Sequence, residues 1–181
     1  MSGFLLDLTD WLFDTHLVEF SLWLAETKVS ALLRNHFLII PTLQVAHILA
    51  IAAAFGAVQM INARVMGMAS TVSTVEGTMR RFTPWIWGGL AALIVTGGGL
   101  ILADPPRELL NALFWVKMAL MAGLILLSLW FQRAIRRNMV SQDIWAAQKG
   151  GKALICAGAI ALSFLWCAIM VAGRLIYYGL F

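Results

Sequence analysis

Long apolar stretches alternate with short charged segments along most of the chain. Residues 35–63, 82–103 and 153–173 contain no Asp, Glu, Lys or Arg, and residues 111–132 contain one charge, Lys117. A helix needs about 20 largely apolar residues to cross a hydrocarbon core about 30 Å thick. Backbone polar groups in lipid must be satisfied within the segment, which requires helices here. The pattern predicts four spans, at about 35–63, 82–103, 110–132 and 153–175.

Residues 1–29 follow a different pattern. Asp7, Asp10 and Asp14 fall on one helical face, opposite a face of leucines, which predicts an amphipathic helix over 3–13. Asp14 is a candidate N-cap for a second short helix over 15–27, and Ser30 is a candidate cap for the first span. Both short helices would lie in the membrane interface, with aromatic anchors.

The fold class follows from these two patterns. We expect an all-α, integral membrane four-helix bundle over 30–181, preceded by an amphipathic interfacial helical segment over 1–29. Composition supports this class, because 61% of residues are apolar and 12% are charged. Soluble domains carry about 45–50% apolar and about 25% charged residues, and disordered chains are richer still in charge. A soluble or disordered protein is thereby excluded.

The basic residues predict the orientation of the chain. Eight lie in the connections after the first and third spans and four on the opposite side: Arg64, Arg80, Arg81, Arg133, Arg136, Arg137, Lys149 and Lys152 against Lys28, Arg34, Arg107 and Arg174. The positive-inside rule places the eight in the cytoplasm, so both termini face outward. For a bacterial inner membrane, that side is the periplasm. The net charge of +4 therefore reports topology, and no nucleic-acid partner is expected.

Ionisable and polar residues within spans are costly and mark candidate functional sites. The first span contains His36, Gln44 and His47. The two histidines are about 20° apart around an ideal helix and about 16 Å apart along it, although Pro41 is predicted to kink this helix. Histidines stacked at two depths are typical of membrane cytochromes b. The spacing therefore favours haem b, with a quinone as the other ligand class, and glycines of the second span would give a flat cofactor room.

A second axial ligand for a six-coordinate haem is not evident. The remaining histidine, His16, precedes the spans. The ligand would be a methionine such as Met118 or Met121, a residue of a second copy, or a residue of another subunit. In the alternative interpretation, His36 is an interfacial residue and His47 forms a hydrogen bond across helices.

The other polar candidates leave alternatives open. Lys117 lies at a depth comparable with that of His47, where it would bind a haem propionate, a quinone carbonyl or a small anion, or else extend to the interface. Arg174 is expected to anchor the end of the fourth span, and Arg64 and Asn62 lie at the end of the first. His16, with nearby glutamates, is a weak candidate for an external metal site and is otherwise part of a solvated helix face.

Three segments resemble a family of small, uncharacterised bacterial four-span membrane proteins. They read HILAIAAAFGAVQMINARVMG, TPWIWGGLAALIVTGGGLILADP and NALFWVKM, within roughly residues 37–130. The shared features are a histidine opening the first span, Arg-x-x-Gly at its end (Arg64 to Gly67), a Thr-Gly second span with tryptophans, and an early lysine in the third. The family pattern has Asp where this chain has Asn62, and it implies no established activity. A looser similarity to cytochrome b561-like bundles rests on helix count and an intramembrane histidine.

These observations lead to three hypotheses of function. We expect a cytochrome-b-like electron-transfer subunit that binds haem or quinone near His47, in a homo-oligomer or a larger membrane complex. The alternative is a cofactor-free membrane anchor that docks a periplasmic partner through its acidic N-terminal segment. A small transporter or metal-handling protein is the weaker third option. The sequence contains no phosphate loop, nucleophile–base pair or paired catalytic carboxylates, so we do not expect a stand-alone enzyme.

Overall fold

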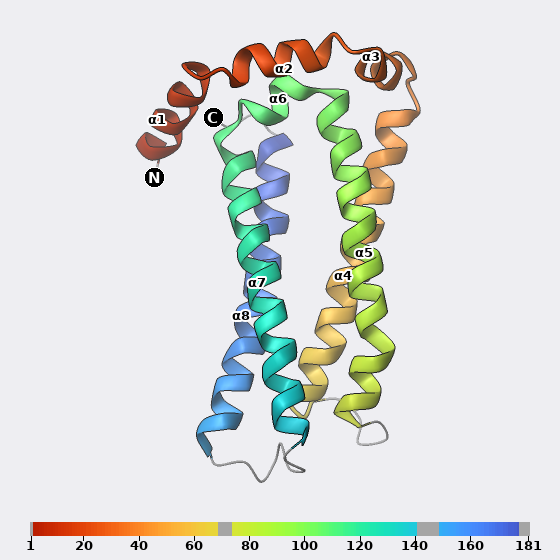
Figure 1. Ribbon diagram of the computed structural model, residues 1–181, viewed down its shortest axis with the longest axis vertical. Helices are drawn as coiled ribbons and strands as arrows, with labels where there is room; N and C mark the ends of the chain where they lie inside the picture. Colours follow the sequence, from red (N-terminus) through yellow and green to blue (C-terminus); the bar gives the residue numbers. More distant parts are fainter. Residues whose placement is uncertain (1, 69–73, 141–148, 178–181) are drawn as a thin grey trace. The chain divides into compact units, whose positions relative to one another are not determined.

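The computed structural model describes residues 2–68, 74–140 and 149–177, and helices without any strand make up this part of the chain (Figure 1). The helices are α1 (Ser2–Phe13), α2 (Leu17–Ala25), α3 (Lys28–Asn35), α4 (Ile39–Val65), α5 (Val75–Ala103), α6 (Pro105–Leu109), α7 (Ala112–Val140) and α8 (Lys149–Tyr177). The helices α4 and α5, residues Ala112–Ile135 of α7 and residues Ala153–Leu175 of α8 are long and apolar enough to cross a membrane. The predicted all-α class with four spans is confirmed.

Side-chain and glycine caps set several helix ends. Thr27 caps α3 by accepting a hydrogen bond from the backbone N–H of Ser30 at 3.3 Å, and Asn111 caps α7 in the same way. The helix α4 ends in a Schellman motif, in which Gly67 has φ 78° and Met68 N–H donates to the carbonyl of Ala63 at 2.9 Å. A residue with a Cβ is strained at this φ. Gly67 of the Arg-x-x-Gly motif therefore has a structural role.

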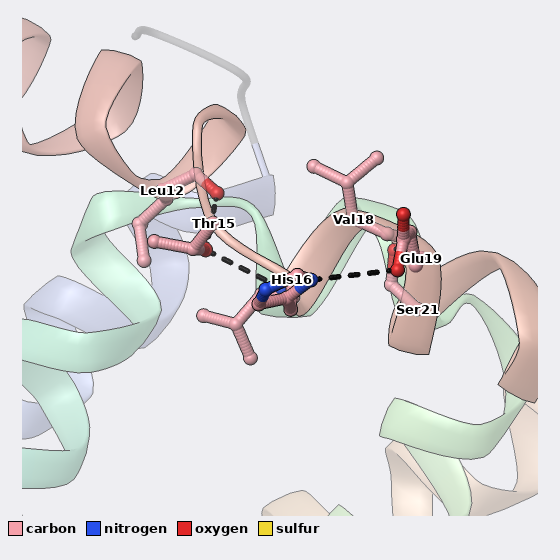
Figure 2. Close-up of polar contacts among 7 residues, drawn as sticks. Leu12, Thr15, His16, Val18, Glu19 and Ser21 are labelled. Atoms are coloured by element: carbon pink, nitrogen blue, oxygen red, sulfur yellow. Dashed lines mark hydrogen bonds and ion pairs between the residues drawn. The ribbon is translucent and has the colours of Figure 1, made fainter.

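Two predicted caps are wrong. Ser30 lies inside α3 and is buried, so it does not cap the first span. Asp14 belongs to the turn between α1 and α2, and the N-cap position of α2 is His16, whose side chain makes no capping bond. The turn is closed by Thr15, whose Oγ1 donates to the carbonyl of Leu12 at 2.7 Å (Figure 2). The same Oγ1 accepts a hydrogen bond from the backbone N–H of Leu17 at 3.4 Å, so Thr15, and not Asp14, supplies a side-chain acceptor at the start of α2.

The first helix has the predicted amphipathic character. Leu12 is 2% exposed, whereas Asp7, Asp10 and Asp14 are exposed. Trp11 and Trp23 are 60% and 61% exposed, which leaves large aromatic surfaces on this segment available to a membrane interface.

The first long helix begins after the predicted start of the first span at about residue 35. The helix α3 ends at Asn35 and α4 begins at Ile39, and the backbone of His36 between them has extended dihedral angles. Pro41 lies in the first turn of α4, where its missing N–H costs no helical hydrogen bond. Pro41 therefore starts the helix instead of kinking it, and His36 is not part of the first span.

The chain divides into two compact units. The first contains the described residues of Met1–Ile51, Leu90–Ala119 and Met170–Phe181, and the second contains those of Ala52–Gly89 and Leu120–Ile169. In the first unit, α2 packs against α6 (Figure 1). Its apolar core, formed by the buried residues Leu109, Ala112, Leu113 and Phe114, is covered by Leu8 of α1 and Leu24 of α2, among others. The N-terminal helices are thus packed parts of this unit.

Candidate functional site

The first unit holds a polar contact between α4 and α5. Nδ1 of His47 lies 2.8 Å from Oγ1 of Thr96, and Thr96 Oγ1 in turn donates to the carbonyl of Ala92 at 2.7 Å. Because a hydroxyl has one proton, Thr96 accepts the hydrogen bond from His47, and Nδ1 therefore carries the hydrogen. The neutral ring then presents its lone pair at Nε2. Nε2 makes no hydrogen bond with any residue that the structure describes.

Glycines of α5 allow α4 to approach closely in this unit. A Cβ added to Gly97 would lie 3.3 Å from Cε1 of His47, and one added to Gly99 would lie 3.1 Å from a methyl group of Leu43. A larger residue at either position would push against α4. Gly98, between them, has open space where its side chain would be, so a flat ligand would meet no Cβ at that position. The glycine run thus serves helix contact at two positions and leaves space at the third.

Lys117 lies in the same compact unit as His47. It follows Ala112, the first residue of α7, by five residues, or about 8 Å along the helix. His47 follows Ile39, the first residue of α4, by eight residues, or about 12 Å. The side chain of Lys117 lies over Gly173 of α8, with Nζ 3.5 Å from the position of an added Cβ. The structure thus places His47 and Lys117 in one unit, with Lys117 packed on α8 and His47 on α5.

Glu108 of α6 is a site residue that the sequence analysis missed. It is half-buried, and it interacts electrostatically with Lys117. Burial raises the pKa of Glu108 above its ordinary value of 4.5, Asp104 raises it further, and Lys117 and Arg107 oppose the rise. The position was not apparent from sequence because Glu108 reads as part of a polar turn between two spans.

The raised pKa of Glu108 predicts a pH dependence of stability. The folded protein binds a proton at this carboxyl more tightly than the unfolded chain does, so stability falls as pH rises from about 4.5 through the folded-state pKa. The variant E108Q lacks this loss and should gain stability relative to the wild type as pH rises. Thermal midpoints in detergent between pH 4 and pH 8 would test this. E26Q, at an exposed glutamate of the same unit, is the control; a parallel pH trend for wild type and E108Q would contradict the prediction.

The remaining predicted cofactor residues are not gathered around His47. His36 is exposed between α3 and α4, where it lines a shallow pocket with Leu32, Phe37, Leu38 and Ile39, so the prediction that His36 and His47 share one helix face is wrong. Gln44 is exposed on α4, and Met118 is 41% exposed on α7. Met121 belongs to the second unit.

His16 does not sit in a metal-binding cluster. Its Nδ1 lies 3.5 Å from a carboxylate oxygen of Glu19, and the two side chains are 100% and 83% exposed (Figure 2). Exposed pairs of this kind contribute little stability. Over the described ranges, no three His, Cys, Asp or Glu residues come together in an arrangement that would hold a metal ion.

The second unit has its own polar cluster, between α4 and α8. Asn62 is 1% exposed, and its Nδ2 donates to the carbonyl of Ala159 and to Oγ of Ser163, each at 3.0 Å. Ser163 Oγ lies 2.7 Å from Oε1 of Gln59, which closes the cluster. Asn62 Oδ1 is buried without a hydrogen-bond partner among the described residues. Asn62 thus supplies amide N–H donors to this cluster.

The two arginines among the predicted polar residues lie at helix ends. Arg64 is in the last turn of α4, half-buried, with Nε lacking a hydrogen-bond partner in the described part of the chain. Arg174 is exposed in the last turn of α8. Basic residues at these positions interact favourably with the helix dipole.

The fold and the site define a small, multi-pass, four-span membrane protein with an imidazole and an ammonium group in one unit. No known protein family, curated protein or solved structure matches the chain. The resemblance to an uncharacterised bacterial four-span family, and the looser one to cytochrome b561-like bundles, therefore stay predictions.

Proposed function

We propose that the protein is a membrane electron-transfer subunit that holds haem b through Nε2 of His47. The observation that carries this proposal is the pair of hydrogen bonds from Nδ1 of His47 to Thr96 and from Thr96 to the Ala92 carbonyl. Metal-ligating histidines typically donate their second N–H to a fixed acceptor, which sets the tautomer and the ring orientation. The sequence analysis gave a hydrogen bond from His47 across helices as the alternative to a cofactor role. In this geometry the same hydrogen bond also leaves the lone pair of Nε2 available to a metal ion.

A quinone fits this imidazole less well than iron does. A quinone carbonyl needs a hydrogen-bond donor, whereas neutral His47 presents an acceptor at Nε2. The lone pair on Nε2 of a neutral imidazole is also the group that binds a metal ion. Haem supplies one-electron chemistry when bound, and the chain's contribution is the ligand and its orientation.

The proposed haem iron needs a second axial ligand, and this ligand is the reason to propose that the protein works within an assembly. In the first unit, His16 and His36 lie outside the spans, and Met118 is 41% exposed on α7. We propose that the sixth ligand comes from a second copy or from another subunit of a membrane complex. The positive-inside rule supports a bacterial inner membrane location with both termini in the periplasm.

An absorption spectrum of the detergent-purified protein tests the proposal. Protein expressed in haem-sufficient cells should show a Soret band and a pyridine haemochrome characteristic of haem b, stoichiometric with the chain. A pure, folded protein without a Soret band, even after incubation with hemin, would overturn the haem proposal. Quinone recovered by solvent extraction of such a sample would favour the quinone version instead.

The alternative of a cofactor-free anchor rests on the N-terminal helices. The exposed Asp7 and Asp10 of α1 and Asp14 of the turn that follows offer a charged surface to a basic partner outside the membrane. Since α2 packs on α6, deleting residues 1–27 would uncover part of the core, and charge reversal of the three aspartates is the cleaner test. Loss of a co-purifying partner from that variant would favour the anchor.

A further inference from the structure

The helix α3 and the short segment that joins it to α4 form an exposed apolar corner, residues 28–39, which we call the α3–α4 corner (Figure 1). Leu32, Phe37 and Leu38 are 55%, 84% and 63% exposed. A shallow pocket of about 410 Å³ lies on this corner, and it is lined by Leu32, His36, Phe37, Leu38 and Ile39. Contiguous apolar surface of this kind marks a site of interaction with a membrane, a protein or a ligand.

The position of the α3–α4 corner in the chain indicates lipid as its neighbour. The pocket includes Ile39, the first residue of α4, and α4 is long and apolar enough to cross a membrane. Within the same unit, Val45, Ile48 and Leu49 of α4 are 57%, 63% and 63% exposed, as expected for a spanning helix that faces lipid. The corner therefore lies where the lipid-facing surface of the first span begins, and the acyl chains of the bilayer supply an occupant for its pocket.

The polar groups at the α3–α4 corner favour a phosphate. Lys28 precedes Leu32 by four residues, so these two side chains lie on the same face of α3. Lys28 and His36 are both exposed, and a histidine ring offers an N–H donor in either protonation state. No Asp or Glu occurs between Glu26 and Glu76, so α3 and the start of α4 carry no acidic group that would repel an anion. Hydrogen bonds between an ammonium group and phosphate oxygens are among the strong ones in proteins.

We propose that the α3–α4 corner binds a phospholipid, with one acyl chain in the pocket and the phosphate on Lys28 and His36. The phospholipid belongs to the leaflet that surrounds the start of the first span. Arg34 of α3 is engaged elsewhere, because its guanidinium donates to the carbonyl of Ala25 and holds α3 to the end of α2. The lipid site is independent of haem binding at His47, and it gives His36 a role outside the spans.

Native mass spectrometry of the full chain in detergent micelles tests the role of the phosphate. The probes are dioleoyl phosphatidylethanolamine, whose headgroup has no net charge, and the diacylglycerol with the same chains, which lacks the phosphate. We expect the wild type to bind the phospholipid about tenfold or more tightly than the diacylglycerol, because of its hydrogen bonds to charged groups. K28A/H36A should bind the two lipids about equally. R81A, which removes an exposed positive charge of the second unit, is the control and should keep the preference. Excess inorganic phosphate should not displace the phospholipid, which distinguishes a lipid headgroup from a free anion.

A second pair of variants tests the pocket. L32S/F37S should weaken the binding of both lipids by about tenfold or more, because the acyl chain loses apolar contacts. I48S/L49S changes two equally exposed side chains on the lipid-facing surface of α4 and should leave both affinities unchanged. Equal losses in the two double variants would show general lipid contact and overturn the site, and so would a preference for the phospholipid that persists in K28A/H36A. If L32S/F37S does not fold, as judged by circular dichroism, K28A/H36A decides, since both of its substitutions are at exposed positions.

Discussion

Replacing His47 by alanine is expected to abolish haem binding and with it the Soret band of the purified protein. The variant lacks the imidazole whose Nε2 is presented by the hydrogen bond from Nδ1 to Thr96. Loss of a partner to a metal ligand typically costs about 10- to 100-fold in metal affinity. Loss of the ligand itself should therefore cost more than about 100-fold. Absorption spectra and hemin titrations of the wild type and H47A measure the effect directly.

Two further variants make the result specific to the geometry at His47. T96V keeps the size of the side chain but cannot accept the hydrogen bond, so it should weaken haem binding by about 10- to 100-fold, whereas T96S keeps the hydroxyl and should stay near the wild type. H36A is the matched control, because His36 is exposed outside α4. Full haem occupancy in H47A, or loss of haem in H36A alone, would show that His47 is not the ligand.

Charge spacing and hydropathy predict the spans because the physical requirement is simple. A bilayer needs a minimum length of apolar helix, and that length is visible in the sequence. The exact start of a span follows from local backbone chemistry instead. The ring of Pro41 provides no N–H for the carbonyl of Phe37, which favours starting the helix at Ile39 rather than running it on from α3. The absence of an N–H at Pro41 therefore already indicates, from the sequence, that His36 lies outside the span.

The residue pairings that the sequence could not predict are contacts between different helices. The sequence analysis identified His47 and Lys117 because an ionisable residue in a span is conspicuous. Thr96 was overlooked although it is a polar residue within a span, and the same rule would have found it. Its pairing with His47 and the cluster around Asn62 depend on which helix faces align, and periodicity within one helix carries no information on that alignment.

Replacing Asn62 by aspartate should destabilise the protein by about 3–5 kcal/mol. The carboxylate would have no N–H to donate to the carbonyl of Ala159, which is fully buried, or to Ser163. It would place an acceptor oxygen in the position of Nδ2, facing that carbonyl, and bury an uncompensated charge in a span. Unfolding followed by circular dichroism in mixed micelles should show this loss of stability.

The loss of unfolding free energy in three variants distinguishes a need for a hydrogen-bond donor at Asn62 from an ordinary packing effect. S163A removes a hydroxyl from the same cluster but keeps the hydrogen bond from Asn62 to Ala159, so it should cost about 1 kcal/mol. N62A removes the hydrogen bond from Asn62 to the Ala159 carbonyl, which Ser163 Oγ also contacts at 2.9 Å, and introduces no charge, so its cost should lie between those of S163A and N62D. The free energies of unfolding should thus fall in the order S163A, N62A, N62D. If N62D is as stable as the wild type, α4 and α8 do not depend on an amide donor at this position.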